Sequence, residues 1–273
     1  MTASSHVRNT ASRAAESKPL EYLARGGFVA YGIIHLIFAW IALQLAFGGR
    51  SGDGDQSGAL QTLAQQPMGK TLVVITIVGM IGLALWQAFE AAIGQSGEQD
   101  KTAIAERFIS GCRTILYLYF AWIGIKVLSG ANASSGDSSQ QSASSLMDSS
   151  GGRFLVGLVG VVVFGVGVGL VIYGVKKKFE KHLNTQEMNA KVRKTTQRLG
   201  IAGYSSKGVA YAISGGLIVT AAVNYDPEKA RGLDAALKTL AGQPYGKWLL
   251  ALIALGIAAF GIYCFFQTRY RKV

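Results

Sequence analysis

Few ionisable or amide side chains occur inside the long apolar stretches of this sequence, and these few are where chemistry would be expected. The candidates among them are His35, Gln44, Gln87, Glu90 and Lys126. Polar groups buried in a membrane are costly, and each one is a functional hypothesis by default. Gln44, Glu90 and Lys126 fall near the ends of apolar stretches, where interfacial water solvates them. His35 is the deepest titratable group, which makes it a candidate proton-relay or quinone-binding residue. The alternative is a neutral histidine hydrogen-bonded to a neighbouring helix.

The sequence lacks the residue patterns that haem binding, phosphate binding and the common hydrolytic mechanisms require. Haem ligation by two histidines needs a second histidine in an apolar stretch, and His6 and His182 lie in polar segments. We find no phosphate-binding glycine loop, no metalloprotease histidine pair and no nucleophile elbow. Paired carboxylates for an enzyme acting on lipids are also missing, although that class stays a third alternative. The sequence predicts no catalytic, cofactor-binding or metal-ligating residue, and we expect a protein that is not an enzyme.

The elements that carry these side chains are six apolar runs of about 20 residues each, the length that a helix needs to cross a bilayer. The chain has 273 residues, of which 50% are hydrophobic and only 15% charged, against roughly a quarter charged in soluble domains. Helices satisfy their own backbone hydrogen bonds and are the natural spanning form. The composition predicts an all-α membrane protein with six transmembrane helices; the runs are 27–47, 71–93, 112–128, 154–175, 202–223 and 248–267.

Lysine and arginine gather beside alternate ends of these runs, and the formal net charge is +12. The positive-inside rule explains this excess as membrane topology, so we expect no nucleic-acid partner. Both termini and the long basic loop are predicted to be cytoplasmic, in a multi-pass protein of the plasma membrane.

The basic loop begins at Lys176 and ends at Arg198. Its simplest role is to determine topology. Two alternatives are a continuation of the fourth apolar helix lying on anionic lipid headgroups, bound by Lys176, Lys177 and Lys178, and a docking site for an acidic partner.

The outer loops contain the clearest internal match. Residues 59–70 read ALQTLAQQPMGK and residues 236–247 read ALKTLAGQPYGK. The leucine spacing fits one face of a short helix in each copy, and Ser57 and Asp234 are plausible N-caps. These extracytoplasmic loop helices either cap an outer cavity or tuck their leucines against the helical hairpin; the leucines are Leu60, Leu63, Leu237 and Leu240.

The middle copy of this loop is degenerate. It keeps only Leu146, Gly152 and Arg153 of the pattern. Because residues 131–152 are dominated by serine, glycine and glutamine, we expect a flexible linker there.

Each copy of the repeat contains two apolar runs, so all three copies have the same orientation in the membrane. Such parallel repeats are related by an axis along the membrane normal, which predicts a pseudo-threefold bundle of three two-helix units. Aligning the copies makes Tyr31, Arg113 and Lys207 equivalent, and also His35, Tyr117 and Tyr211. If this helical face lines the axis, then His35, Tyr117 and Tyr211 form a polar ring in the membrane.

The fourth apolar run is rich in glycine. Gly165 and Gly169 form a small-residue face of the kind that lets helices approach closely. That face packs either inside this bundle or against a second copy of the chain or another membrane protein.

The arrangement resembles a family of bacterial integral membrane proteins built from three copies of a two-helix unit, catalogued as domain of unknown function 1206. RGGFVAYGIIHL at residues 25–36 and IAGYSSKGVAYAISGG at residues 201–216 carry the resemblance, together with the QPMGK and QPYGK turns. The resemblance implies a location in the cell membrane and no catalytic residue.

These observations divide the chain into a cytoplasmic tail (1–24), repeat 1 (25–94), repeat 2 (95–175), a basic cytoplasmic linker (176–200) and repeat 3 (201–273). The function that we expect is a non-enzymatic structural or accessory component that packs with other membrane proteins in the lipid bilayer. The alternative is a small transporter or channel with a pathway along the pseudo-threefold axis.

Overall fold

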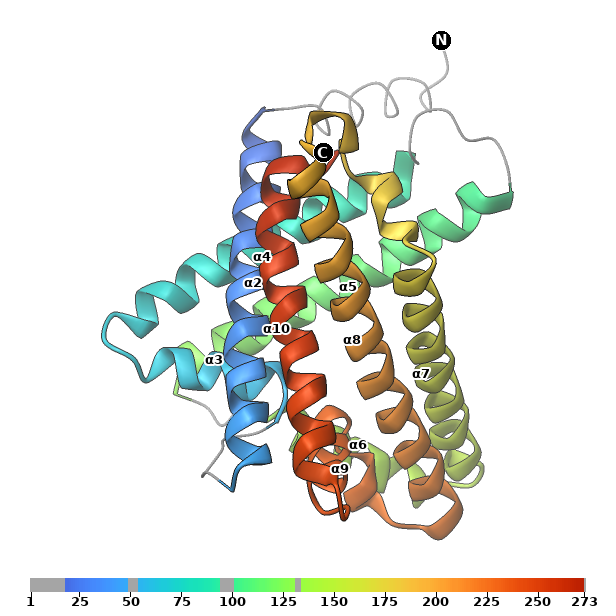
Figure 1. Ribbon diagram of the computed structural model, residues 1–273. Helices are drawn as coiled ribbons and strands as arrows, with labels where there is room; N and C mark the ends of the chain where they lie inside the picture. The colour runs from blue at the N-terminus through green and yellow to red at the C-terminus, as the bar shows by residue number, and fades with distance from the viewer. Residues whose placement is uncertain (1–17, 49–53, 94–100, 131–133, 273) are drawn as a thin grey trace.

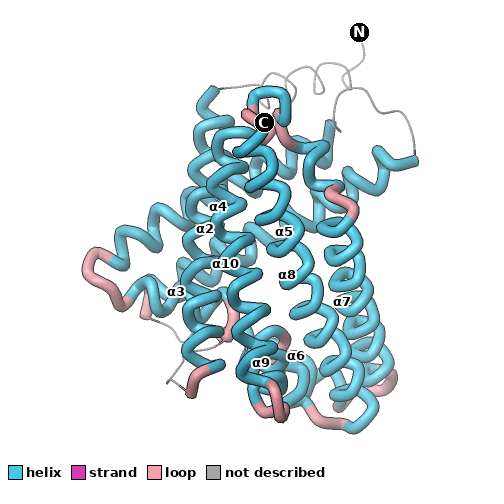
Figure 2. The backbone as a smooth tube through the Cα atoms, in the orientation of Figure 1, coloured by secondary structure: helices cyan, strands magenta, loops and turns pink. Residues whose placement is uncertain are grey.

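The computed structural model describes residues 18–48, 54–93, 101–130 and 134–272, so most of the expected tail and part of three loops lie outside it. In these residues all regular structure is helical, apart from one isolated bridge between Leu183 and Arg271. Figures 1 and 2 show the helices. In chain order they are α2 (Lys18–Ala46), α3 (Gln56–Ala64), α4 (Gly69–Ile93), α5 (Lys101–Leu128), α6 (Ser135–Met147), α7 (Gly152–Val175), η1 (Lys178–His182), η2 (Thr185–Glu187), α8 (Ala190–Asn224), η3 (Pro227–Ala230), α9 (Leu233–Ala241) and α10 (Gly246–Tyr270).

Six of these helices are long and apolar enough to cross a membrane: α2, α4, α5, α7, α8 and α10. The prediction of six spanning helices is therefore confirmed. Only 17% of the apolar window of α7 is buried inside the protein. In water this face would be a large exposed apolar patch, whereas lipid chains solvate it without cost.

The contacts between the spans follow a cyclic order. The second span of each repeat packs on the first span of the next repeat, in the pairs α4–α5, α7–α8 and α10–α2. Within a repeat, α2 packs on α4 and α8 on α10, whereas α5 and α7 make no comparable contact in the described residues. Figure 1 shows α7, α8, α10 and α2 side by side, with α4 and α5 running obliquely to them. This order is the one that a threefold arrangement requires, and the symmetry itself stays a prediction.

Glycines bring α7 and α8 into close contact, but they are not the glycines that we expected. A Cβ atom added to Gly167 would lie 2.6 Å from the carbonyl oxygen of Gly208, and one added to Gly215 would lie 2.7 Å from that of Gly160. At Gly165 and Gly169 an added Cβ would meet nothing within 4 Å. The expectation of packing inside the bundle at Gly165 and Gly169 is therefore wrong. The seven-residue spacing keeps Gly160 and Gly167 on the face toward α8, and the other two point outward.

The middle outer loop is also more ordered than its composition predicted. Residues 135–147 form α6, where a flexible linker was expected. The Ser134 hydroxyl caps this helix by accepting from the Asp137 N–H, and Ala143 and Met147 are buried beneath it. The linker prediction is wrong because capping and two buried side chains offset the weak helix propensity of serine.

The same turn joins each outer helix to the span that follows it. The amide of Gly69 donates to Gln66 O, that of Gly152 to Ser149 O, and that of Gly246 to Gln243 O. A Cβ added to these glycines would lie 2.1, 1.6 and 2.0 Å from the carbonyl oxygens of Leu63, Leu146 and Leu240, respectively. No side chain fits there, so this turn requires glycine in all three repeats.

The two proposed N-caps each lie two residues beyond the observed N-cap residue. Asp55 caps α3 by accepting from the Gly58 N–H, and Ser57 donates to Asp55. In α9 the N-cap residue is Gly232, which has no side-chain cap. Ser57 and Asp234 instead lie in the first turns of their helices, where they contact other helices of the outer layer.

The basic loop does not continue the fourth apolar helix, so that alternative is wrong. The chain leaves α7 at Lys176, and Lys177 adopts a left-handed backbone conformation with φ of 53°. Phe179 then turns inward and stacks on Tyr204, at 5.6 Å between ring centroids. The end of α10 closes over this segment, since Lys272 N donates to His182 O. Lys176, Lys177 and Lys178 remain exposed.

Candidate functional site

Lys207 of α8 is buried in the centre of the bundle against His35 of α2. Its Nζ lies 3.1 Å from His35 Nε2 and 3.1 Å from the hydroxyl oxygen of Tyr31. His35 is 1% exposed and Lys207 is 9% exposed. An amine and an imidazole therefore contact each other where bulk water does not reach them.

The tautomer of His35 follows from its second hydrogen bond. His35 Nδ1 lies 2.8 Å from the backbone carbonyl oxygen of Tyr31, one helical turn earlier. A carbonyl oxygen only accepts, so Nδ1 carries the proton and donates it. In a neutral imidazole the lone pair is then on Nε2, which faces Lys207. Lys207 consequently donates to both Nε2 and the Tyr31 hydroxyl.

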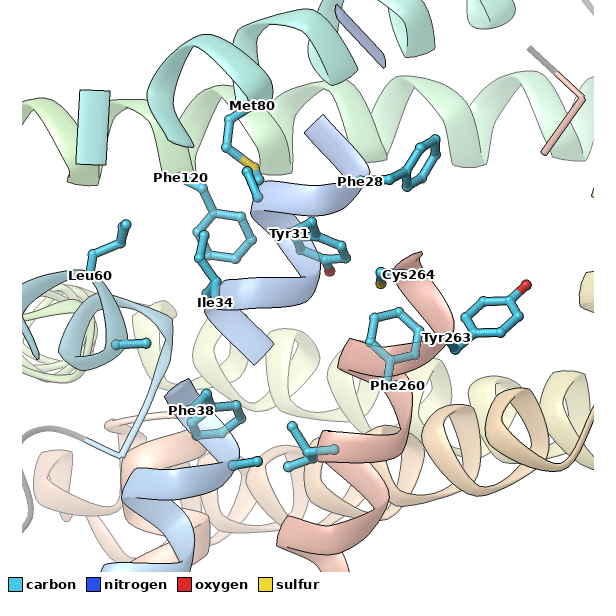
Figure 3. Close-up of a cluster of buried hydrophobic side chains, with 14 of the residues drawn as sticks. Phe28, Tyr31, Ile34, Phe38, Leu60, Met80, Phe120, Phe260, Tyr263 and Cys264 are labelled. Atoms are coloured by element: carbon cyan, nitrogen blue, oxygen red, sulfur yellow. The ribbon is translucent and has the colours of Figure 1, made fainter. Parts of the chain in front are cut away.

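Aromatic rings enclose the rest of the lysine head. Lys207 Nζ lies 3.9 Å from the ring centroid of Phe260 and 5.2 Å from that of Tyr31. Figure 3 shows Tyr31 of α2 meeting Phe260 and Cys264 of α10 in the core between the two helices. Lys207 forms no ion pair with a carboxylate among the described residues, and the charged side chain that acts on it most strongly is another cation, Arg113. Neutral acceptors and π-faces alone surround this amine.

Tyr117 and Tyr211, the other two residues of the predicted polar ring, approach this pair from α5 and α8. Tyr117 of α5 packs edge-on against Tyr31, at 5.6 Å between ring centroids. Tyr211 of α8 lines a small cavity together with His35 and Lys207, and it hydrogen-bonds to Gln56, the first residue of α3. His35 is fully buried, Tyr117 is buried and Tyr211 is half-buried.

This cavity lies between the Lys207–His35 pair and the outer helices. Its remaining lining comes from Phe38, Ala210, Leu233 and Ile257. It offers about 10 Å³ to the centre of a water molecule, which is about the room that a single water needs. The structure therefore shows no open pathway at this level of the bundle in the part of the chain that it describes.

The helices α3, α6 and α9 form a layer at the end of the bundle opposite the C-terminus, and we call this layer the cap. Each pair of cap helices is joined by hydrogen bonds. The Gly54 N–H donates to Asp234 Oδ1 at 2.9 Å, and the Ser135 N–H donates to Ser57 Oγ at 2.9 Å. Arg231 donates to Asp137 and Gln140 of α6. The three repeats are thus locked together above the cavity.

The loop leucines lie where the cap meets the spans. Leu60 and Leu237 are each 1% exposed, Leu63 is buried, and Leu240 is half-buried against the same core. The middle repeat has Ala143 at the position equivalent to Leu60 and Leu237, counting back from the turn glycine. Its Leu146, equivalent to Leu63 and Leu240, is exposed.

Asp234 is the charged centre of the cap. Burial by itself would raise the pKa of this carboxyl, but hydrogen bonds from Lys238, the Gly54 N–H and Arg231 outweigh burial and lower the pKa below its usual range. Its Oδ2 accepts from Lys238 Nζ at 2.8 Å and from Arg231 Nε at 3.0 Å. Asp234 is therefore ionised at neutral pH, and its charge stabilises the cap.

A second polar cluster lies toward the opposite end of the bundle. Glu90 accepts from Gln87 at 2.6 Å and from Ser110 at 3.3 Å, and Arg113 hydrogen-bonds to Tyr173. The other two polar residues singled out from the sequence lie apart from both clusters: Gln44 is half-buried, and Lys126 lies over the ring of Trp122.

Lys207 is the site residue that sequence reasoning missed. In the sequence analysis Lys207 contributed only to the lysine and arginine pattern that predicts topology. Alignment of the repeats nevertheless made it equivalent to Tyr31 and Arg113. That equivalence was the available signal, because it placed Lys207 on the helical face of Tyr211. No three His, Cys, Asp or Glu side chains come together as possible metal ligands within the described ranges.

Six spans, a threefold-repeated outer turn and a buried polar cluster define a helical-bundle membrane protein with internal repeats. The family model named Domain of Unknown Function (DUF1206) matches the chain three times, over residues 26–94, 110–177 and 202–271. The chain belongs to this family, as the resemblance predicted. It is similar to the uncharacterized protein YxxB of Bacillus subtilis (strain 168), with 29% identity over 261 residues that cover 94% of each protein. No solved structure matches the chain.

Proposed function

We propose that this protein transports a small solute or ion along the axis of the bundle and that the Lys207–His35 pair is the central binding element. The observation that carries this proposal is the buried lysine with only neutral acceptors around it. A charge inside the membrane is expensive and is typical of transport and proton pathways. A protein that served only as packing material would gain by having an apolar residue there.

On this proposal, the described conformation is a closed one. The cavity beside Lys207 has room for about one water, and the cap closes it on one side through Gln56 and Leu233. Passage would require separation of the cap helices, which are joined to one another by hydrogen bonds that water can replace. Hydrogen-bonded layers of this kind are suited to act as gates.

The test is a permeability measurement in proteoliposomes. Stopped-flow light scattering would follow vesicle volume after mixing with sodium chloride, potassium nitrate, ammonium acetate or urea. We expect faster volume recovery than in empty vesicles for at least one of these solutes, and loss of that effect in Lys207→Met. Lys126→Met is the matched control, since Lys126 lies near a span end over Trp122. Equal rates for protein-containing and empty vesicles with every solute would contradict transport.

The accessory role that the sequence favoured is the second candidate, and one observation supports it. Gly165 and Gly169 lie on the outward face of α7 with no protein atom against them. A small-residue face turned to lipid is suited to close packing with another transmembrane helix, from a second copy or from a different membrane protein.

Gentle detergent extraction from the native host and mass spectrometry would test this second candidate. A stoichiometric partner that is lost in Gly165→Leu, and retained in a Gly111→Leu control, would support it; an added Cβ at Gly111 also meets nothing within 4 Å. Recovery of the bare monomer under all conditions would contradict it. Neither candidate involves an enzymatic reaction.

The orientation is part of the same proposal. We infer that both termini are cytoplasmic in the plasma membrane and that the cap faces outward, because the basic residues cluster at the end opposite the cap. The exposed side chains of Lys176, Lys177 and Lys178 are placed to bind anionic lipid headgroups. Labelling of single cysteines in intact cells, at the cap and at Lys178, would test the orientation.

A further inference from the structure

We propose that Lys207 and His35 act together as a binding site for one exchangeable proton, held as a Lys207 ammonium that donates to His35 Nε2. This inference rests on the proposed transport function and names the proton as an ion bound on the axis. It requires that the pair alternates between one proton and none, and that it never holds two.

The hydrogen-bond pattern fixes this count. His35 Nδ1 donates to the Tyr31 carbonyl, so only Nε2 is left to accept from Lys207 at 3.1 Å. If Nε2 were also protonated beside an ammonium, two cationic donors would face each other without an acceptor. With one proton, the ammonium donates to Nε2 and to Tyr31 Oη. With none, the neutral amine can still donate to Nε2.

The surrounding side chains disfavour a second proton. The titratable groups that face the pair are Tyr31 from α2, Arg113 and Tyr117 from α5, Tyr204 and Tyr211 from α8, and Cys264 from α10. Among these groups Arg113 is the charged one, and it is a cation. Glu90, the carboxylate of α4, acts on Arg113. A second positive charge would therefore lack a partner in a medium of low dielectric constant.

The cavity supplies a route for exchange. His35 and Lys207 both line it, and Gln56 and Tyr211 contribute polar atoms to its wall. Because it has room for about one water, a single molecule can lie against the pair and receive or deliver the proton. An opening of the cap would connect this water to the outside.

Solid-state NMR of the full chain in lipid bilayers, with ¹⁵N-labelled histidine, tests the proposal directly. The His35 signals are assigned by their disappearance in His35→Asn. We expect neutral His35 with the proton on Nδ1 throughout the range from pH 9 to pH 5. In Lys207→Met the pair has lost its ammonium, and we expect the doubly protonated imidazolium form of His35 to appear as the pH falls. Lys126→Met should give the wild-type spectrum.

Two results in the spectra of the wild-type protein itself would overturn the inference. One is an Nε2–H tautomer of neutral His35, and the other is full conversion of His35 to imidazolium between pH 7 and pH 5 while Lys207 remains an ammonium in ¹⁵N-lysine spectra. The outcome is separable from the transport assay. If the proteoliposomes show transport but the NMR spectra show no shared proton, only this inference is overturned. If the spectra show the shared proton but the proteoliposomes show no transport, only the transport function is overturned.

Discussion

The backbone N–H of Gly54 donates to Asp234 Oδ1, across a separation of 180 residues and between the first and third repeats. This bond and the contacts of Ser57 and Arg231 join three helices that are equivalent in the repeats. The cap is therefore a single layer made by all three repeats, and its residues Gln56 and Leu233 line the cavity described beside Lys207.

Removing the arginine of the cap should loosen that layer. In Arg231→Ala both Asp137 and Asp234 lose a charged donor, and Asp234, which is fully buried, retains Lys238 and the Gly54 N–H. Losing charged hydrogen bonds at a partly buried site costs about 1.5–3 kcal/mol. We expect deuterium exchange in α6 and α9 to rise at least tenfold. Lys229→Ala, which breaks a more exposed pair with Asp226, should leave that exchange unchanged.

The cap should also weaken in acid. The folded-state pKa of Asp234 lies below its unfolded value, so its contribution to stability is present above the unfolded pKa, near 3.9, and is lost as the pH falls through the folded pKa. We expect cap opening to increase below about pH 4, measured by exchange corrected for the intrinsic effect of pH. In Asp234→Asn the cap should be weaker at pH 7 and should show little further change in acid.

His182 gives the opposite end of the bundle a different pH dependence. Burial, with help from Arg271, Arg113 and Lys181, lowers the pKa of His182 to about 3. The unfolded chain binds this proton near pH 6.5, so the folded state loses stability as the pH falls from about 6.5 toward 3. We expect the melting temperature of the wild type to drop over this window and that of His182→Gln to drop less. An equal drop in both proteins would contradict this assignment.

The turn glycines should be far less tolerant than the outward glycines of α7. In Gly246→Ala the new methyl group would lie 2.0 Å from Leu240 O, which forces the turn to open. Overpacking of this kind typically costs about 1–3 kcal/mol of folding stability. Gly165→Ala adds a methyl group in open space and gains helix propensity of about 1 kcal/mol. We expect a drop of several degrees in melting temperature for the first and no drop for the second.

Replacing the buried lysine should separate stability from function. Lys207→Met removes a charge from the core and keeps the length of the side chain, a change that is often neutral or stabilising. We expect a melting temperature at or above that of the wild type, together with loss of solute flux. A large fall in stability would show that Lys207 serves the fold.

The sequence by itself determined the six spans, their order and the repeated outer turn. Length and apolarity fix a transmembrane helix locally, since a bilayer of about 30 Å sets the requirement. The match between residues 59–70 and 236–247 likewise revealed two cap helices, each followed by the same turn. The glycine of this turn is required for a local reason, since an added side chain would collide with the preceding helix. Alignment of the copies made His35, Tyr117 and Tyr211 equivalent positions of the repeat, and the polar ring that they would form stays a prediction.

Only the tertiary structure showed that Lys207 lies against His35 and that Gly160 and Gly167 face α8, while Gly165 and Gly169 face outward. Helical periodicity gives the direction of a side chain relative to its own helix, whereas the rotation of each helix against its neighbours is set by packing of the whole bundle. Tertiary contacts also explain why the serine-rich middle loop is helical. Besides the local cap at Ser134, Asp137 accepts from Arg231 and Met147 is buried, and propensity along the chain does not report such tertiary contacts.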